Sequence, residues 1–377
     1  MVRSWPGQDW GVAYDALILV SFGGPEGPHD VLPFLRNVVR GRGVPDERLA
    51  AVAEHYYHFD GVSPINAQCR ELLAALRIDL AEAGVDLPLY WGNRNWHPLL
   101  ADTLAQMRDD GVRRALAFVT SPFGSYSSCR QYLDDFESAR AAVGSAAPVL
   151  DKIRHYHDHP GYVLPHADAV RQALRDLSDV EPVRLVFTAH SIPSTMESQS
   201  GPAGGRYSSQ LRETAKLVAE EAGPGRADGA SGDRMAWDLV WQSRSGPPQV
   251  PWLEPDINDH LATLADAGVK GVVVSPIGFI SDHLEVVWDL DTEAAETARK
   301  LGLRYQRART PGTDPRFVSM VRDLFLERLD MDRGARSGTG FAGEGEKVAR
   351  NSAMPRARLG TLPIWDTCPT DCCRPRT

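Results

Sequence analysis

The sequence predicts an α/β fold built on two parallel sheets, and three features of the chain support this prediction. Short, continuous apolar runs rich in branched residues recur along the chain, as expected of strands that are buried on both faces. Helical patterns separate these runs, which is the arrangement of parallel strands joined by right-handed crossovers. The length of 377 residues exceeds what one hydrophobic core usually supports.

The first predicted strand covers residues 16–22 (ALILVSF) and ends at Gly23-Gly24-Pro25, because glycine and proline interrupt regular structure. Similar apolar runs predict further strands at residues 87–91, 115–120, 183–189, 236–241 and 271–276. Helices are predicted between them, at residues 70–82, 98–110, 132–143, 166–177, 207–222 and 257–267. This number of strands favours two sheets over one.

The midpoint of the chain carries two prolines and a glycine, in residues 156–165 (YHDHPGYVLP), which predicts a crossover between two halves. We therefore expect one domain over residues 1–160 and a second over residues 161–331. Outside the elements above, we expect an exposed loop at residues 223–233 and a tail at residues 332–377, which begins with a Gly-, Arg- and Ser-rich linker over residues 332–354.

Composition and charge exclude several classes of protein. The formal charge of -9 argues against nucleic-acid binding, which needs clustered cations. No apolar run approaches the roughly 18 residues of a membrane-spanning helix. Residues 1–15 lack the basic, apolar and small-residue regions of a secretory signal, so a cytoplasmic location is expected.

Ligands of open α/β sheets bind beyond the carboxyl ends of the strands, where His190 follows a predicted strand. A histidine there is a base, a metal ligand or simply a hydrogen-bonded loop residue. Glu285, Asp289 and Glu293 recur every four residues, which places them on one face of a predicted helix over residues 281–300. Such a row is either an ordinary solvated face or, next to a cavity, an attractor of hard cations. Imidazole with carboxylate suits transient binding of ferrous iron.

Three of the five cysteines, Cys368, Cys372 and Cys373, lie in the last ten residues. Three thiolates so close together favour a metal or cluster over a frayed tail that binds nothing. Iron-sulfur clusters usually have four cysteine ligands, so the fourth is expected from Cys129 or Cys69. Cys129 lies in a polar loop and is the preferred candidate, whereas Cys69 falls on the inner side of an amphipathic helix and is expected in the core.

His155, His157 and His159 alternate in the sequence HYHDH and invite comparison with a zinc site. Because they lie where a strand gives way to a loop, with Pro160 following, we expect hydrogen-bonded structural roles instead.

Along nearly its whole length the sequence resembles the ferrochelatases, which insert ferrous iron into porphyrins. The resemblance rests on several long motifs in the family's order: LVSFGGPEGP (residues 19–28), FDGVSPIN (59–66), GNRNWHP (92–98), FTAHSIP (187–193), WQSRSGPPQVPWLEPDI (241–257) and SPIGFISDHLEVVWDLDTEA (275–294). It implies two Rossmann-like domains with a porphyrin cleft between them.

The resemblance also implies roles for particular residues. His190 and Glu285 match the family's paired metal-site residues and are the predicted catalytic pair, with Fe²⁺ as substrate. Asp289 and Glu293 match its outer line of acids, a path for iron or protons. The tail cysteines with Cys129 resemble the cluster-bearing actinobacterial members, which implies a [2Fe-2S] cofactor.

The predicted porphyrin-binding residues come from segments that line the cleft in relatives, and they are Phe22, Arg40, His55, Ser63, Tyr126 and Tyr132. Phe22 stands where many relatives have a tyrosine near the metal, and a phenylalanine cannot ligate iron. His55 stands where some relatives have arginine.

The resemblance favours coproporphyrin III over protoporphyrin IX as substrate, a difference of two propionates. Two other functions stay open on the sequence alone. One is a chelatase that loads cobalt or iron into another tetrapyrrole, and the other is a haem or iron-sulfur carrier that inserts nothing.

Overall fold

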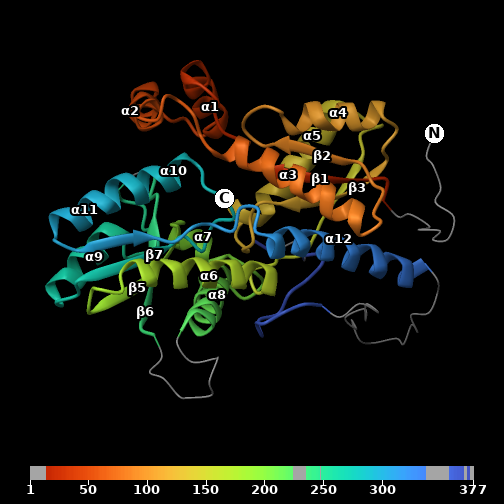
Figure 1. The fold of residues 1–377 in the computed structure, drawn as a ribbon. Helices are drawn as coiled ribbons and strands as arrows, with labels where there is room; N and C mark the ends of the chain where they lie inside the picture. Colours follow the sequence, from red (N-terminus) through yellow and green to blue (C-terminus); the bar gives the residue numbers. More distant parts are fainter. Residues whose placement is uncertain (1–13, 224–234, 247, 337–355, 369–371, 374–377) are drawn as a thin grey trace.

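The computed structural model of the protein describes residues 14–223, 235–246, 248–336, 356–368 and 372–373. The eight strands in these residues form two parallel, four-stranded sheets flanked by helices (Figure 1). The strand order is β2-β1-β3-β4 in the first sheet and β6-β5-β7-β8 in the second. The predicted α/β fold with two Rossmann-like sheets is therefore confirmed.

The strands are β1 (Ala16–Ser21), β2 (Leu89–Asn93), β3 (Arg114–Val119), β4 (Val149–Lys152), β5 (Val183–His190), β6 (Trp237–Gln242), β7 (Gly271–Ser275) and β8 (Arg304–Arg307). The helices are η1 (Pro28–Asp30), α1 (Val31–Val38), α2 (Asp46–Tyr57), α3 (Ile65–Glu82), α4 (Leu100–Asp109), η2 (Tyr126–Arg130), α5 (Gln131–Val143), α6 (Pro160–Asp176), α7 (Ser194–Ser198), α8 (Arg206–Ala222), α9 (Ile257–Asp266), α10 (Leu284–Val286), η3 (Val287–Ala294), α11 (Ala295–Lys300) and α12 (Pro315–Arg336).

Each predicted strand exists, within two residues at either end, and each sheet adds an edge strand that was not predicted. β4 (VLDK) and β8 (RYQR) have only four residues each and carry charged side chains. They pair on one side only, with β3 and β7 respectively. An edge strand needs no continuous apolar run, because it is not buried on both sides by neighbouring strands.

Several expectations about the connections were wrong. Residues 160–165 are not a crossover loop but the first turns of α6, which tolerates Pro165 in its interior. Residues 332–336 are not part of a linker, because α12 continues to Arg336. Helices α1, α2 and α12 were not predicted. The rest of the expected linker, and all but residue 223 of the expected loop at 223–233, lie outside the described residues.

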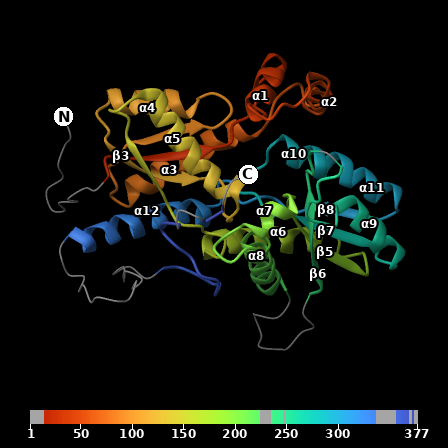
Figure 2. The ribbon, with the colours of Figure 1, turned by 180° about the vertical axis from the view of Figure 1, so that it is seen from behind.

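The two halves share a core. Leu17 of β1, Phe187 of β5 and Phe317 of α12 belong to one continuous cluster of buried side chains. Helix α12 packs against α3 of the first half and α6 of the second, and in Figures 1 and 2 it runs alongside both. The proposed boundary near residue 160 coincides with the start of α6. No helix in the described parts of the chain is long and apolar enough to cross a membrane.

Candidate active site

His190 is the last residue of β5, and its side chain is 35% exposed at the carboxyl edge of the second sheet. Its Nδ1–H donates to the Ser191 carbonyl oxygen at 2.5 Å. Because a carbonyl only accepts, this bond leaves the Nε2 lone pair of the neutral ring available to a proton or a metal ion. The Tyr207 hydroxyl donates to the His190 carbonyl oxygen at 2.9 Å and holds the backbone in place.

Glu285 faces His190 from α10, in the segment that follows β7. Its Oε2 lies 3.6 Å from His190 Nε2, and its side chain is 47% exposed. This separation is longer than a hydrogen bond. It suits two ligands of one divalent ion, since metal bonds to imidazole nitrogen and carboxylate oxygen are about 2.1 Å long. The end of β5 and the helix that follows β7 thus bring together the residues predicted as the metal-site pair.

Asp289 lies in η3, which is a π-helix. The expected helix over residues 281–300 was therefore wrong for residues 281–283, which are not helical, and for residues 287–294, which are not α-helical. The side chains of Ser243 and Gln242 donate to its carboxylate, the latter at 3.3 Å. Burial, with the negative charges of Glu285 and Glu293, raises the pKa of Asp289 to about 7. Ser243 has a left-handed φ of 60°, a conformation that non-glycine residues rarely adopt.

Glu293 lies in the same π-helix and is exposed. The acidic row therefore leads from half-exposed Glu285 past partly buried Asp289 to exposed Glu293. Within the described residues, no lysine or arginine forms an ion pair with these three carboxylates. Their charge is also felt by Tyr56, whose pKa is raised by burial and by the charges of Glu285 and Asp289.

Two of the predicted porphyrin-binding residues contact the segment that carries Glu285. The His55 ring stacks on Trp288, with ring centroids 4.1 Å apart and planes 8° from parallel. The buried Ser63 hydroxyl accepts a hydrogen bond from the Leu284 N–H at 3.3 Å. Both residues come from the first half of the chain, so they join the two halves at the site.

Phe22 and Tyr132 are brought together by Arg94. Its guanidinium carbon lies 5.7 Å from the Phe22 ring centroid and 4.6 Å from that of Tyr132, and its side chain pairs with Asp135. The Phe22 side chain is 36% exposed at the end of β1, whereas Tyr132 is buried.

Tyr126 and Arg40 lie in other surroundings. Tyr126 begins the π-helix η2, and its pKa is raised by burial and by Asp134. Arg40 is exposed just beyond α1 and donates to the Asn37 side-chain oxygen at 2.6 Å.

Four residues with contacts in this site were given no role from the sequence: Gln242, Ser243, Trp288 and His283. Gln242 is the last residue of β6 and Ser243 follows it, a position that does point to the carboxyl edge of the sheet. Burial lowers the pKa of His283, which also senses the charges of Glu285 and His190. Nothing in the sequence distinguishes Trp288 from a core residue, because its role depends on a partner in α2.

Cys129 and the three tail cysteines come together. Hydrogen bonds from the Cys129 and Cys372 thiols lower the pKa of Cys368 to about 3. The Cys372 and Cys373 sulfurs are 3.7 Å apart, and the Gly201 N–H donates to Cys373 Sγ at 3.1 Å. We call these four residues the cysteine cluster.

Arg206, at the first position of α8, is one of the cations beside the cysteine cluster; Lys152 is another. The Arg206 guanidinium stacks on Trp365 at 3.9 Å and donates to the Pro363 carbonyl at 2.8 Å. All four thiols interact electrostatically with it. Cys69 instead lies in the main core, where burial raises its pKa to about 11, and it was correctly predicted as a core residue.

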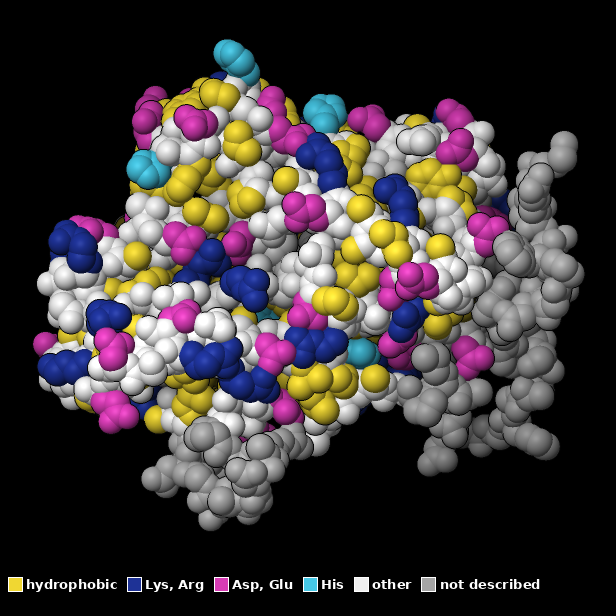
Figure 3. Space-filling view, in the orientation of Figure 1, with side chains coloured by type: hydrophobic (Ala, Val, Ile, Leu, Met, Phe, Trp, Pro, Cys, Tyr) yellow, Lys and Arg dark blue, Asp and Glu magenta, His cyan; other side chains and the backbone are white. Residues whose placement is uncertain are grey.

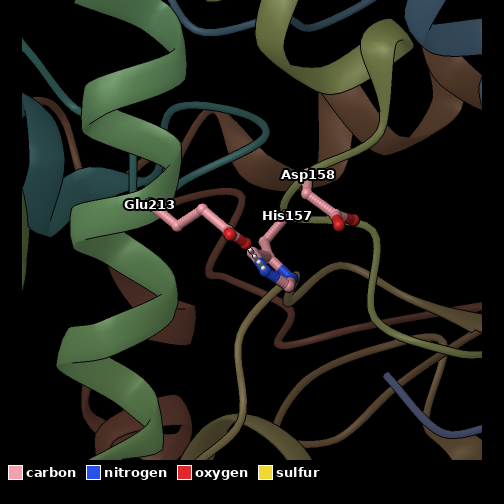
Figure 4. Close-up of side chains that lie close together, drawn as sticks. All are labelled: His157, Asp158 and Glu213. Carbon is pink, nitrogen blue, oxygen red and sulfur yellow. Dashed lines mark hydrogen bonds and ion pairs between the residues drawn. The ribbon is translucent and has the colours of Figure 1, made fainter. Parts of the chain in front are cut away.

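The alternating histidines have hydrogen-bonding or buried positions. His159 Nδ1 accepts from the Gly161 N–H at 3.0 Å at the start of α6, and His155 is buried beside Cys129. His157 Nε2 lies 3.2 Å from Glu213 Oε2 of α8, and Figure 4 shows these two side chains facing one another.

His157, Asp158 and Glu213 place three possible metal-ligating atoms within 4.8 Å of one another. The carboxylates already have partners from the tail, however. Glu213 accepts from the Thr361 N–H at 2.7 Å, and Asp158 pairs with Arg358. This group therefore anchors the tail to the body of the protein.

The model of the ferrochelatase family matches residues 14–329. A protein named coproporphyrin III ferrochelatase from Nocardia farcinica is 54% identical over 356 residues, which cover 92% of this chain and 98% of that protein. A protein of the same name from Streptomyces griseus is 50% identical over 96% of this chain and 94% of its own length. Among solved structures, SirB from Bacillus subtilis with Fe3+ matches with a TM-score of 0.49 and 12% identity, over 85% of this chain and 97% of its own. The extent of the family match and the identity to these relatives show that this chain belongs to the ferrochelatase family.

Proposed function

We propose that this protein inserts Fe²⁺ into coproporphyrin III to form Fe-coproporphyrin III. Relatives of that name, at 47% to 55% identity, support the substrate. The observation that carries the proposal is the pair formed by His190 Nε2 and Glu285 Oε2, 3.6 Å apart at the carboxyl edge of the second sheet.

Insertion requires that iron lose its water and that two pyrrole nitrogens lose their protons. His190 is suited to take a proton or bind iron, because Nδ1–H is committed to the Ser191 carbonyl and Nε2 is left with a lone pair. Glu285 supplies the second ligand of the pair, a carboxylate oxygen. Both groups bind ferrous iron without the permanence of a thiolate site.

The acidic row serves this site as a route for iron or protons. Asp289 and Glu293 carry no paired lysine or arginine in the described residues, so their charge remains available to a cation. The pKa of Asp289, raised to about 7 by burial first and by the neighbouring carboxylates second, allows it to exchange a proton near neutral pH.

The porphyrin contacts are proposed on the same basis. Exposed Phe22 offers an apolar surface to a macrocycle, and it has no oxygen to ligate iron. Arg40 has a guanidinium at the surface, suited to a propionate. We assign Ser63 and His55 to the same region because they contact the Glu285 segment. Tyr126 and Tyr132 are assigned from the family resemblance.

We further propose that the cysteine cluster holds a [2Fe-2S] cofactor. A single tetrahedral ion with thiolate bonds of about 2.3 Å requires all its sulfurs to lie about 3.8 Å apart. Among the described residues, however, the only group of three ligand atoms within 4.8 Å of one another is at His157, Asp158 and Glu213. The spread of the four thiols thus suits two irons better than one. The Arg206 cation and the Gly201 N–H would offset the negative charge of thiolates.

The test is anaerobic insertion of Fe²⁺ by the purified protein, with coproporphyrin III and protoporphyrin IX offered separately and followed by loss of porphyrin fluorescence. We expect faster conversion of coproporphyrin III. Preference for protoporphyrin IX would contradict the substrate, and no conversion of either would favour a carrier or a chelatase for another macrocycle. A cytoplasmic location, expected from the sequence, is tested separately by cell fractionation.

A further inference from the structure

The segment that carries Glu285, residues 282–293, has five carboxylates in two different environments. Glu285, Asp289 and Glu293 form the acidic row described above, without a paired lysine or arginine among the described residues. Asp282 and Asp291 instead share one cation, Arg307, the last residue of β8.

Arg307 bonds both of these carboxylates as a fork. Its Nη1 and Nη2 each lie 3.0 Å from an oxygen of Asp282, while its Nε and Nη2 lie 2.6 and 2.9 Å from the oxygens of Asp291. The arginine side chain is only 18% exposed, so these bonds are partly shielded from water. Paired, charge-assisted bonds of this kind fix geometry as well as supplying energy.

The two aspartates that Arg307 binds lie on either side of Glu285 and Asp289 in the sequence. Asp282 precedes α10 and Asp291 lies inside the π-helix, so one guanidinium spans the stretch in which Glu285 and Asp289 lie. Arg307 belongs to a strand whose register with β7 is fixed by backbone hydrogen bonds. The start of the segment is also held from the first half, because the Asp282 N–H donates to Gln68 Oε1 at 2.9 Å.

We infer that Arg307 is a positioning residue of the iron site, whose guanidinium ties Asp282 and Asp291 to the sheet and so sets the distance of Glu285 and Asp289 from His190. This inference rests on the proposed role of Glu285 in binding iron. It also explains why only two of the five carboxylates in the segment are paired with an arginine. The arginine neutralises the two structural carboxylates and leaves the acidic row free for the substrate cation.

The test compares Arg307→Lys and Arg307→Gln with the wild type in steady-state insertion, with Fe²⁺ and coproporphyrin III varied separately. Lysine keeps the charge but cannot bond two carboxylates as a fork. We expect KM for Fe²⁺ to rise on the order of tenfold in the lysine variant and further in the glutamine variant, because ligand placement on the ångström scale controls such sites. KM for the porphyrin should not change. Hydrogen exchange of residues 283–294 in the metal-free protein should become faster.

Arg304→Gln is the matched control, because Arg304 lies on the same strand in an exposed pair with Asp179 at 3.5 Å.

Glu285→Gln is measured in parallel, so that failure of this inference can be told apart from failure of the proposed function. If it raises KM for iron and Arg307→Lys does not, the inference fails and the proposed function stands. If Glu285→Gln leaves KM for iron unchanged, the proposed role of Glu285 fails. A fall in kcat alone in the lysine variant would show a merely structural role and also overturn the inference. If the glutamine variant does not fold, the lysine variant decides.

Discussion

His190 and Glu285 lie half-exposed at the carboxyl edge of a sheet, with carboxylates around them. The cysteine cluster is largely buried against the start of α8, with Arg206 beside it. The first environment attracts a cation but leaves it accessible, whereas the second favours negatively charged thiolates and encloses them. The surroundings of His190 and Glu285 therefore suit an ion that binds transiently. Those of the cysteine cluster suit a group that stays bound.

The two regions also differ in how they are assembled. The pair depends on β5 and β7, which are neighbours in one sheet. The cysteine cluster depends on a tail held by side-chain contacts, including Glu213 with Thr361 and Arg206 with Pro363. The pair, which lies on the second sheet and the helix after β7, is therefore expected to survive changes in the tail, while the cysteine cluster is not. On the face in Figure 3, acidic and basic side chains are interspersed, so neither environment extends over this surface as a broad patch of one charge.

The largest expected effect is that of His190→Ala. Loss of the Nε2 atom should slow iron insertion by roughly 10² to 10⁴-fold, the usual contribution of a positioned acid or base. Porphyrin binding and the visible absorbance of the proposed [2Fe-2S] cofactor should persist. The measurement is fluorescence-detected insertion beside porphyrin titration, with the exposed His29→Ala as control. Unchanged turnover would refute the catalytic assignment.

The converse change is Cys129→Ser, which should remove the visible absorbance of the proposed [2Fe-2S] cofactor because a hydroxyl is a poor substitute for a thiolate ligand. Cys69→Ala should keep the absorbance, since Cys69 lies in the core. Absorption spectra and iron content of the purified variants provide the measurement. A normal spectrum for Cys129→Ser would imply a different fourth ligand.

Asp289→Asn tests the electrostatics of the first region. Because the pKa of Asp289 is raised from 3.8 to about 7, the folded state binds its proton more tightly than the unfolded state. This group therefore lowers stability as pH rises from about 4 to 7, by at most roughly 4 kcal/mol. The free energy of unfolding of the asparagine variant, measured relative to that of the wild type, should therefore be higher at pH 8 than at pH 4.

Thermal melting of the metal-free protein across this pH range measures the effect, with the exposed Asp266→Asn as control, because Asp266 is not among the charges that act on Asp289. The same pH dependence in Asp289→Asn and wild type would show that Asp289 titrates normally.

The smallest expected effect is that of Glu213→Gln on the tail. Burial would raise the pKa of Glu213, but hydrogen bonds from His157, Thr361 and Leu362 lower it to about 2. The ionised group thus stabilises the docked tail above pH 4.5, and this contribution is lost as pH falls toward 2. The variant should be cleaved faster by trypsin at Arg356 or Arg358. Glu220→Gln, on the same helix, should not be. Equal cleavage rates would mean that other contacts hold the tail.

The local pattern of residue types in the sequence was sufficient to predict much of the fold and part of the candidate site. Strands buried by neighbours on both sides have continuous apolar runs, so β1, β3, β5 and β7 were predictable. The edge strands β2 and β6 were predicted from apolar runs of their own, whereas the four-residue edges β4 and β8 have none and were not predicted. His190 was predictable as a residue at a strand end. The π-helix was not, because the spacing of Glu285 and Asp289 is compatible with an α-helix as well.

The sequence by itself determined the α/β class, the family, and the chemical types gathered at the two regions. Those properties depend on residue order and on motifs that local interactions preserve. Only the tertiary structure decided which groups meet: Arg307 with Asp282 and Asp291, Trp288 with His55, and Cys129 with the tail. Each of these contacts joins segments far apart in the chain. Their formation depends on how sheets and helices pack, and no local pattern records that packing.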